Sequence, residues 1–184
     1  NITNRLILLQ DKLPPFSDII AIKIIEEETH KKINEIFNSF EKKPIAAASV
    51  AQVHKGILKN GNRVAIKVLR PNIEQTLFRD FKFFYGICNM LEFFSTNCKR
   101  LSLKEIIATF AHSSLDEIDL RLEASNSEQL SENFIDYELF DTPKIYWEYT
   151  TKKLLTSEFI DGVRIDEINN LKTNINVKNL TTVA

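Results

Sequence analysis

Apolar residues recur every three or four positions in several parts of the chain, the spacing that places them on one face of a helix. The first such part covers residues 18–29. It follows Ser17, a suitable N-cap, and has the acidic side chain of Asp18 in the first turn, where the helix dipole favours it. A second, shorter pattern covers residues 33–40 and ends before Pro44. Two helices are therefore expected at the start of the chain.

The longer helical patterns lie further along. One begins after Pro71, and its apolar face is formed by Ile73, Leu77, Phe81, Phe84, Cys88 and Leu91. Another covers residues 103–134 and is expected to bend near Ser113. A last amphipathic turn is expected over residues 165–171, before a tail rich in Asn, Thr and Lys. The chain should thus contain more helix than strand.

Between the helices the pattern changes to that of strands. Residues 44–69 show no helical period, but they contain a β-rich stretch around Val53, the hairpin dipeptide Asn60-Gly61 and the apolar run 64–68. Strand, tight turn and strand are expected here.

Two more strands are expected near the end of the chain. Residues 144–149 and 154–160 are rich in aromatic and β-branched side chains, and Asp161-Gly162 closes the second as a turn signal.

Composition narrows the class of protein. The 184 residues are 43% hydrophobic and 27% charged, as in ordinary globular domains, and 24 basic side chains nearly balance 25 acidic ones. No nucleic-acid partner is expected from this balance. Cys88 and Cys98 lack the neighbours of a zinc site, so free thiols, a reducing compartment and no metal centre are expected. No run approaches the ~20 apolar residues of a membrane span, which favours a cytoplasmic protein.

One stretch carries recognisable chemistry. In protein kinases, a loop G-x-G-x-x-G-x-V covers the ATP phosphates and the lysine of V-A-I-K binds two of them. Here Ala46, Ala48 and Ala51 stand at the glycine positions before Val53, and Lys67 ends Val-Ala-Ile-Lys fourteen residues later. Glycine allows φ > 0 and close approach of backbone N–H groups to phosphate, and alanine restricts both. A stiffer phosphate loop is expected.

These residues resemble the UbiB/AarF family of atypical protein-kinase-like proteins associated with ubiquinone biosynthesis. The resemblance extends over nearly the whole chain and is carried by five segments: Leu9-Gln10-Asp11-Lys12-Leu13-Pro14-Pro15-Phe16, Pro44 to His54, Val64 to Pro71, Glu117 to Ala124, and Leu154 to Phe159. The alanine-rich loop is the most specific of them.

The resemblance implies an α+β fold, a kinase-like N-lobe whose small antiparallel sheet is joined by several family-specific helices. It divides the chain into an N-terminal helical extension (1–43), the N-lobe (44–162) and the start of a linker (163–184). Inserted helices would occupy 72–100, and an αC-like helix would occupy 103–134. The catalytic C-lobe and the family's K-x-G-Q motif have no counterpart, and the chain starts with Asn1, so a fragment is expected.

The same resemblance assigns the site residues. It implies a phosphate loop formed by Ala46, Ala47, Ala48 and Ser49, with Lys67 as the phosphate-binding lysine. Glu123 would be its ion-pair partner, and Glu117 and Asp119 would form the family's E-x-D motif on the same helix. Backbone groups of Ser157, Glu158, Phe159 and Ile160 would read the adenine edge as a hinge. The implied cofactor of the intact protein is ATP or ADP with Mg²⁺, and the implied partners are ubiquinone-biosynthesis proteins, a quinone precursor or the surface of the inner membrane.

Simpler interpretations stay open. Lys67 could be a solvated strand residue, Asp119 could compete with Glu123 for it, and Glu117 could merely pair with Arg121 four residues on. His54 and His112 are expected to be structural or solvent-facing. After Glu158 the only aspartates are Asp161 and Asp166, with no H-x-D or D-F-G pattern, so the chain alone is expected to be inactive. The alternative function is a non-catalytic module that binds proteins or membranes, or a degraded gene product.

Overall fold

The computed structural model describes residues 14–95, 100–137 and 140–162. Its α-helices are α2 (Asp18–Thr29), α3 (Ile33–Ile36), α4 (Ile73–Phe94), α6 (Leu103–Asp116) and α7 (Leu120–Asn133), with a 3₁₀ turn, η1, at Trp147–Tyr149. Its strands are β1 (Phe37–Phe40), β2 (Ala46–Ala47), β3 (Ala51–Leu58), β4 (Arg63–Leu69) and β5 (Leu154–Glu158). The turn expected over residues 165–171, like Cys98 and Asp166, lies outside the described residues.

The strands form one antiparallel sheet in the order β1-β3-β4-β5, and β2 also pairs with β3. The β3–β4 hairpin turns at Asn60-Gly61 as expected, with Gly61 at a φ of 89° that favours glycine. Register fixes one row of residues across the sheet: Ala46, Val53, Lys67 and Leu155 are successive Cα partners. Because neighbouring residues in such a row share a face, Ala46 and Lys67 lie on the same side of the sheet.

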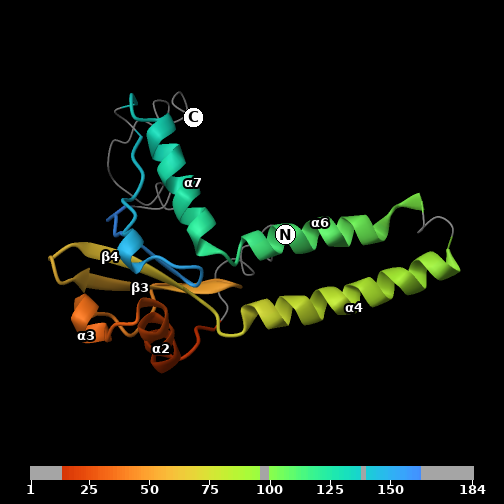
Figure 1. The fold of residues 1–184 in the computed structure, drawn as a ribbon, viewed down its shortest axis with the longest axis horizontal. Helices are drawn as coiled ribbons and strands as arrows, with labels where there is room; N and C mark the ends of the chain where they lie inside the picture. Colours follow the sequence, from red (N-terminus) through yellow and green to blue (C-terminus); the bar gives the residue numbers. More distant parts are fainter. Residues whose placement is uncertain (1–13, 96–99, 138–139, 163–184) are drawn as a thin grey trace, which may run out of the picture.

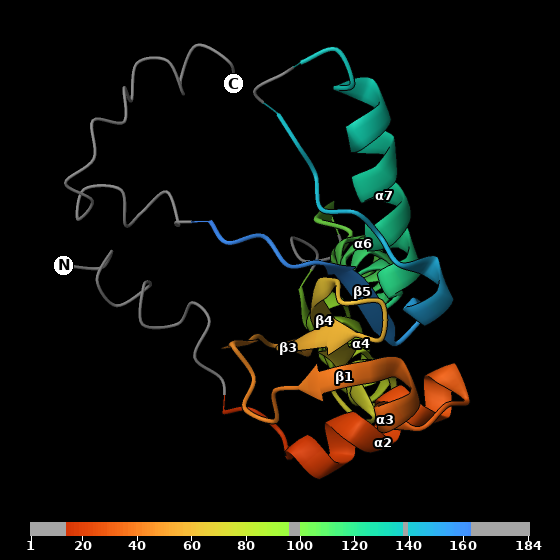
Figure 2. The same cartoon turned by 90° about the vertical axis from the view of Figure 1, so that its left-hand side faces the viewer.

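Two apolar clusters cover the sheet. On one face, Ile25 of α2 packs on residues from four strands, namely Phe37, Leu58, Val64, Ile66, Val68 and Leu154. The second cluster joins the other side to α7 and is formed by Ala51, Leu69, Ile118, Leu120, Ala124, Ile145 and Leu155. In Figure 2, α2 and α3 lie below the sheet and α7 rises beside β5. Among the described residues, the face that carries Lys67 is therefore covered only at its α7 end.

Helices α4 and α6 run antiparallel and form an arm that extends away from the sheet (Figure 1). Phe81 and Phe110 meet edge to face inside it, with ring centroids 5.9 Å apart, and Lys104 pairs with Glu92 at 2.9 Å. Other aromatic side chains of α4 are exposed: Phe83 by 67%, Phe93 by 83% and Phe94 by 79%. None of the helices in the described part of the chain is long and apolar enough to cross a membrane.

The expected helix over residues 103–134 is two helices. The break lies at residues 117–119 and not near Ser113, because Ile118 turns into the core and is only 2% exposed. The N–H of Leu120 donates to the carbonyl of Lys152 at 3.0 Å, which fixes the start of α7 against the end of the sheet. A tertiary contact thus interrupts an apolar pattern that predicts one continuous helix.

The helix expected over residues 33–40 ends after one turn. Phe37 and Phe40 belong instead to β1, which pairs with the end of β3. An isolated turn of helix is unstable, and here strand pairing and the stacking of Phe40 on His54, at 4.9 Å between centroids, compete with it. Gly56 of β3 permits the close approach, since a Cβ there would lie 3.1 Å from the Phe37 ring.

The strand expected over residues 144–149 is also absent. Only Ile145 forms a β-bridge, with Ser157, and the chain then turns through η1. The indole N–H of Trp147 donates to Glu128 of α7 at 2.6 Å, which draws the segment away from β5. Composition favours a strand here, but contacts with α7 prevail.

A buried chain of polar groups ties β3 to the N-terminal segment. The N–H of Phe16 donates to the Gln52 side-chain oxygen at 3.0 Å, and the Gln52 amide nitrogen lies 2.8 Å from His54 Nε2. His54 Nδ1 lies 2.9 Å from the carbonyl of Glu41. Satisfying all three contacts requires a neutral imidazole that donates from Nδ1 and accepts at Nε2. Burial lowers the pKa of His54, in agreement with that state.

This contact set predicts a loss of stability in mild acid. Below pH ~6.5 His54 is protonated in the unfolded chain, whereas its lowered pKa disfavours protonation in the folded protein. The melting temperature should therefore fall as the pH drops from 7 to 5.5. His54→Asn should be less stable at pH 7 and should show a flatter profile.

A matched control is His30→Asn, because His30 has a φ of 54°, a conformation that asparagine tolerates. Its melting temperature at pH 7 should equal that of wild type. Parallel profiles for wild type and His54→Asn would refute the neutral His54 contacts.

Candidate functional site

Lys67 and Glu123 form an ion pair between the sheet and α7. Lys67 Nζ lies 2.6 Å from Glu123 Oε2 and 2.9 Å from Oε1, across 56 residues of sequence. The two side chains are 30% and 48% exposed. Strand β4 presents the lysine, and α7 presents the glutamate from its first turn. The expected pairing is thus present in the structure, and solvent still reaches the ammonium group.

The pair stands on the wall of a cavity of about 710 Å³, here called the Lys67 cavity. Val50 of the alanine-rich turn and Lys67 lie on one side of it, and residues of α6, α7 and the break between them on the other: Ser113, Asp116, Glu117, Asp119, Leu122, Glu123 and Asn126. The structure therefore brings Lys67 and three of the expected acidic residues to one concave surface. The other expected site residues do not line it: Ala46, Ala47, Ala48, Ser49, Glu158 and Ile160.

The two acids of the expected E-x-D motif do not share a helix. Glu117 directly follows α6, whereas Asp119 is the N-cap of α7 and accepts the backbone N–H of Arg121 at 3.1 Å. Asp119 also binds the Arg121 guanidinium at 2.6 and 2.9 Å, and these hydrogen bonds lower the pKa of the Asp119 carboxyl. Arg121 thus pairs with Asp119 and not with Glu117. Asp119 is engaged and leaves Lys67 to Glu123.

The alanine-rich segment is a tight turn between β2 and β3. Ala48 N–H donates to the carbonyl of Ala51 at 2.8 Å. In the described chain, left-handed φ values occur only at His30, Asn72, Ser102 and Gly61, so the turn needs no glycine. Within the same described part, no hydrogen bond uses the N–H of Ser49 or Val50. Two backbone donors are therefore available at the tip of the turn.

Arg70 holds this turn in place. Its backbone N–H donates to the carbonyl of Val50 at 2.8 Å, and its Nε donates to the carbonyl of Ala48 at 3.0 Å. A second guanidinium nitrogen reaches the carbonyl of Pro14 at 3.1 Å. Arg70 was not expected to contribute to the site. The only signal for it is its position, three residues after Lys67 and directly after the strand that pairs with β3.

The segment expected to act as a hinge has only part of its backbone available. The N–H of Glu158 donates to the carbonyl of Lys144 at 2.8 Å, and the N–H of Phe159 to that of Arg63 at 3.0 Å. In the described residues the N–H of Ile160 has no such partner. Asp161, next in the chain, pairs with Arg63 at 2.7 Å, and this hydrogen bond lowers the pKa of its carboxyl. Of these amides, Ile160 is the donor that a ligand could use.

Among the residues that the structure describes, no group of three or more His, Cys, Asp and Glu side chains could hold a metal ion. Cys88 is a free thiol buried in the α4–α6 arm.

A lysine on an antiparallel sheet, paired with a glutamate from a neighbouring helix beside a tight loop, is the arrangement of the small lobe of protein kinases. The chain belongs to the ABC1 atypical kinase-like domain family, whose family model matches residues 8–184.

Relatives from two species agree with this family. The "Probable protein kinase UbiB" of Pseudomonas paraeruginosa strain PA7 is 38% identical over 172 residues, which cover 94% of this chain and 32% of the relative. The protein of the same name from Pseudomonas putida strain F1 is 39% identical over 168 residues, 91% of this chain and 31% of the relative. The chain thus spans about a third of the length of these curated relatives.

A solved structure has the same fold. The Mycobacterium tuberculosis protein Rv3197, solved in complex with erythromycin, matches with a TM-score of 0.69 and 28% identity. The match covers 87% of this chain and 40% of that protein. The mixed fold of helices and antiparallel sheet is therefore shared with a known protein.

The partly exposed ion pair should contribute little to stability. Glu123→Gln should lower the free energy of unfolding by about 1 kcal/mol or less, because solvent-exposed pairs gain little over hydration. Urea denaturation measures this change. Glu117→Gln is the matched control, since Glu117 lines the same cavity without a side-chain partner among the described residues and should be neutral. A loss above about 3 kcal/mol would instead indicate a buried, structural pair.

Proposed function

We propose that the chain is the nucleotide-binding N-lobe of a UbiB-type atypical kinase or ATPase that supports ubiquinone biosynthesis. The observation that carries this proposal is the contact between Lys67 and Glu123, 2.6 Å long, on the wall of the Lys67 cavity. Family membership and the names of the relatives support the same function.

The residues present fit the phosphates of a nucleotide. Lys67 provides a cation whose position Glu123 restricts, and the tip of the alanine-rich turn adds the N–H groups of Ser49 and Val50. Bound ATP would supply the phosphoryl group and its negative charge. Lys67 would attract that charge while Glu123 keeps the ammonium group from turning to solvent. Arg70 acts one step away, as a positioning residue that fixes the carbonyl groups of the turn.

The proposed adenine contacts lie at the end of β5. The N–H of Ile160 would donate to the base and the carbonyl of Glu158 would accept from it, because the N–H groups of Glu158 and Phe159 are already paired with the protein. The described residues supply no cluster of ligands for Mg²⁺. A divalent ion would accompany the nucleotide phosphates.

Nucleotide binding predicts a thermal shift that depends on Lys67. Titration of the chain with Mg-ATP or Mg-ADP should raise the melting temperature by mass action, and Lys67→Ala should abolish most of the rise. Lys59→Ala, in the β3–β4 turn, removes an equal charge outside the Lys67 cavity and should behave as wild type. No shift at millimolar nucleotide, or an equal shift in Lys67→Ala, would overturn the proposal.

The alanine-rich turn should set how the phosphates are held. Ala48→Gly gives the backbone at the tip more freedom, and nucleotide affinity or the preference between ATP and ADP should change. Isothermal titration calorimetry with both nucleotides measures this. Ala47→Gly is the matched control because Ala47 is fixed in the ladder opposite Gln52. Identical constants for wild type and Ala48→Gly would mean that the turn does not contact phosphate.

The second candidate function is a non-catalytic interaction module. The exposed phenylalanines of the α4–α6 arm, among them Phe83, Phe93 and Phe94, favour it, since apolar surface of this kind marks contact with another molecule. The nucleotide titration separates the two functions. A melting temperature that does not respond to nucleotide would leave the arm as the functional surface.

A further inference from the structure

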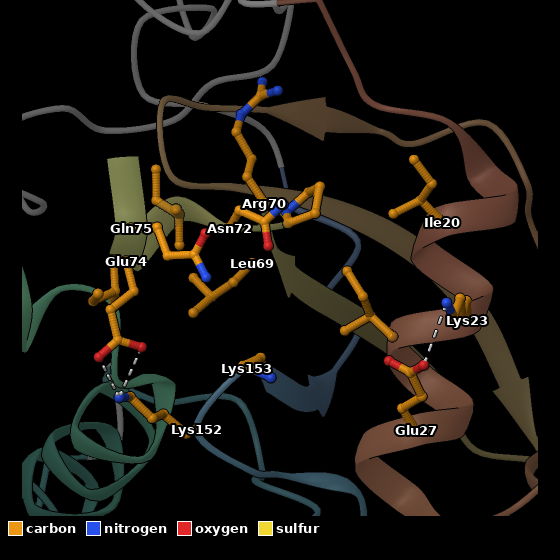
Figure 3. Close-up of a pocket in the computed structure, with 14 residues that line it drawn as sticks. Ile20, Lys23, Glu27, Leu69, Arg70, Asn72, Glu74, Gln75, Lys152 and Lys153 are labelled. Carbon is orange, nitrogen blue, oxygen red and sulfur yellow. Dashed lines mark hydrogen bonds and ion pairs between the residues drawn. The ribbon is translucent and has the colours of Figure 1, made fainter. Parts of the chain in front are cut away.

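A second cavity, of about 380 Å³, lies on the other side of the β4–α4 junction from the alanine-rich turn (Figure 3). We call it the α2/α4 pocket. It is bounded by α2, by the chain that leads from β4 into α4, and by Lys152 and Lys153 at the start of β5. Small-molecule sites in proteins have volumes of about 300–1,000 Å³, so this one is suited to a molecule of one or two rings.

The floor of the pocket is apolar and rigid. It is formed by side chains from α2, β4, α4 and the break between α6 and α7: Ile24, Leu69, Ile73 and Ile118. Leu69 is 3% exposed and Ile118 is 2% exposed, and both belong to the core cluster that joins the sheet to α7. Their positions are therefore set by the fold, and the floor exists before any ligand arrives.

The rim is charged, and its balance is positive. Four cationic side chains, Lys23, Arg70, Lys152 and Lys153, face two carboxylates, Glu27 and Glu74. Figure 3 shows Lys152 beside Glu74 at one side of the pocket and Lys23 beside Glu27 at the other, with Leu69 between them. Arg70 is used elsewhere, on the alanine-rich turn, and Lys153 is bound to Glu28 at 3.0 Å.

Two of the four cations, Lys23 and Lys152, have only long contacts with the described residues. Lys23 Nζ lies 3.6 Å from Glu27 Oε1, and its side chain is 72% exposed. The more enclosed of the two is Lys152, whose side chain is 42% exposed. Its Nζ lies 3.4 and 3.5 Å from the two carboxylate oxygens of Glu74, beyond the 2.7–2.9 Å of a strong charge-assisted hydrogen bond. An ammonium group has three N–H donors, so Lys152 can bind a second anion and give up only its long contact with Glu74. Its backbone carbonyl, bound to Leu120 N–H, is independent of that side chain.

We propose that the α2/α4 pocket binds a small aromatic or alicyclic carboxylate, with the ring on Leu69, Ile73 and Ile118 and the carboxylate on Lys152. The site is separate from the Lys67 cavity. Ile118 lies between Glu117 and Asp119, whose side chains line that cavity, while its own side chain faces the pocket. The proposal does not depend on nucleotide binding.

The test uses 2-naphthoate as the probe and its neutral analogue 2-naphthamide as the comparison. With isoleucine methyl groups labelled, NMR titration should show saturable shifts of Ile24, Ile73 and Ile118 with naphthoate. Naphthamide should bind at the same methyl groups roughly tenfold more weakly, because a hydrogen bond to a charged group is the stronger one. No binding at millimolar naphthoate, equal affinity for the amide, or shifts confined to Ile106 on the α4–α6 arm would overturn the proposal.

Two variants with opposite effects identify the anchor. Lys152→Gln should weaken naphthoate roughly tenfold and leave naphthamide unchanged, whereas Glu74→Gln should strengthen naphthoate by releasing Lys152. Disruption of the fold could not produce that increase. Lys42→Gln, an exposed lysine outside the pocket, is the matched control and should equal wild type. A loss of naphthoate affinity in Glu74→Gln, or none in Lys152→Gln, would exclude Lys152 as the anchor.

Discussion

The antiparallel register of β3 and β4 is the constraint on which the candidate site depends. It sets Val53 opposite Lys67 and so places the alanine-rich turn, which continues into β3, beside the lysine. A shift of the β3–β4 register by one residue would turn the Lys67 side chain into the apolar cluster between the sheet and α2. Val68 or Ile66 would be exposed in its place. The buried alternate residues of both strands, together with the Asn60-Gly61 turn, prevent that shift. Packing on the buried face of the sheet therefore determines which side chains lie on the face that carries Lys67.

Three features without local sequence signals then complete the site. The backbone carbonyls of Lys152 and Lys153 accept hydrogen bonds from the N–H groups of Leu120 and Leu69, respectively. One short segment therefore holds both the start of α7 and the end of β4. Arg70 fastens the alanine-rich turn to β4 by two hydrogen bonds. Arg121 forms an ion pair with Asp119, so Asp119 does not compete with Glu123 for Lys67. The ion pair of Lys67 with Glu123 is consequently held by polar contacts that surround it, and its own energy matters less than its position.

The sequence predicts elements well where the pattern is local. The N-cap Ser17, the β3–β4 turn and the long helix α4 follow from residues within one element, and all three are present. It fails where distant contacts decide: Phe37 and Phe40 have helical spacing yet pair with β3, and Ile118 interrupts a continuous helical pattern to fill the core. The pairing of Lys67 with Glu123 came from family resemblance, because no periodicity links residues 56 positions apart. The bond of Arg70 to the turn could not be predicted, since it depends on side-chain geometry.

The backbone of the alanine-rich turn has a consequence for how this segment can vary. Since none of its residues adopts a left-handed conformation, the backbone makes no demand for a residue without a Cβ. Ala46, Ala48 and Ser49 are exposed, so packing within the described residues leaves room for their side chains. Serine or cysteine would meet the same conformational requirement as alanine. Sequence drift in this loop is thus free of the torsion-angle restriction that applies to a loop that relies on glycine.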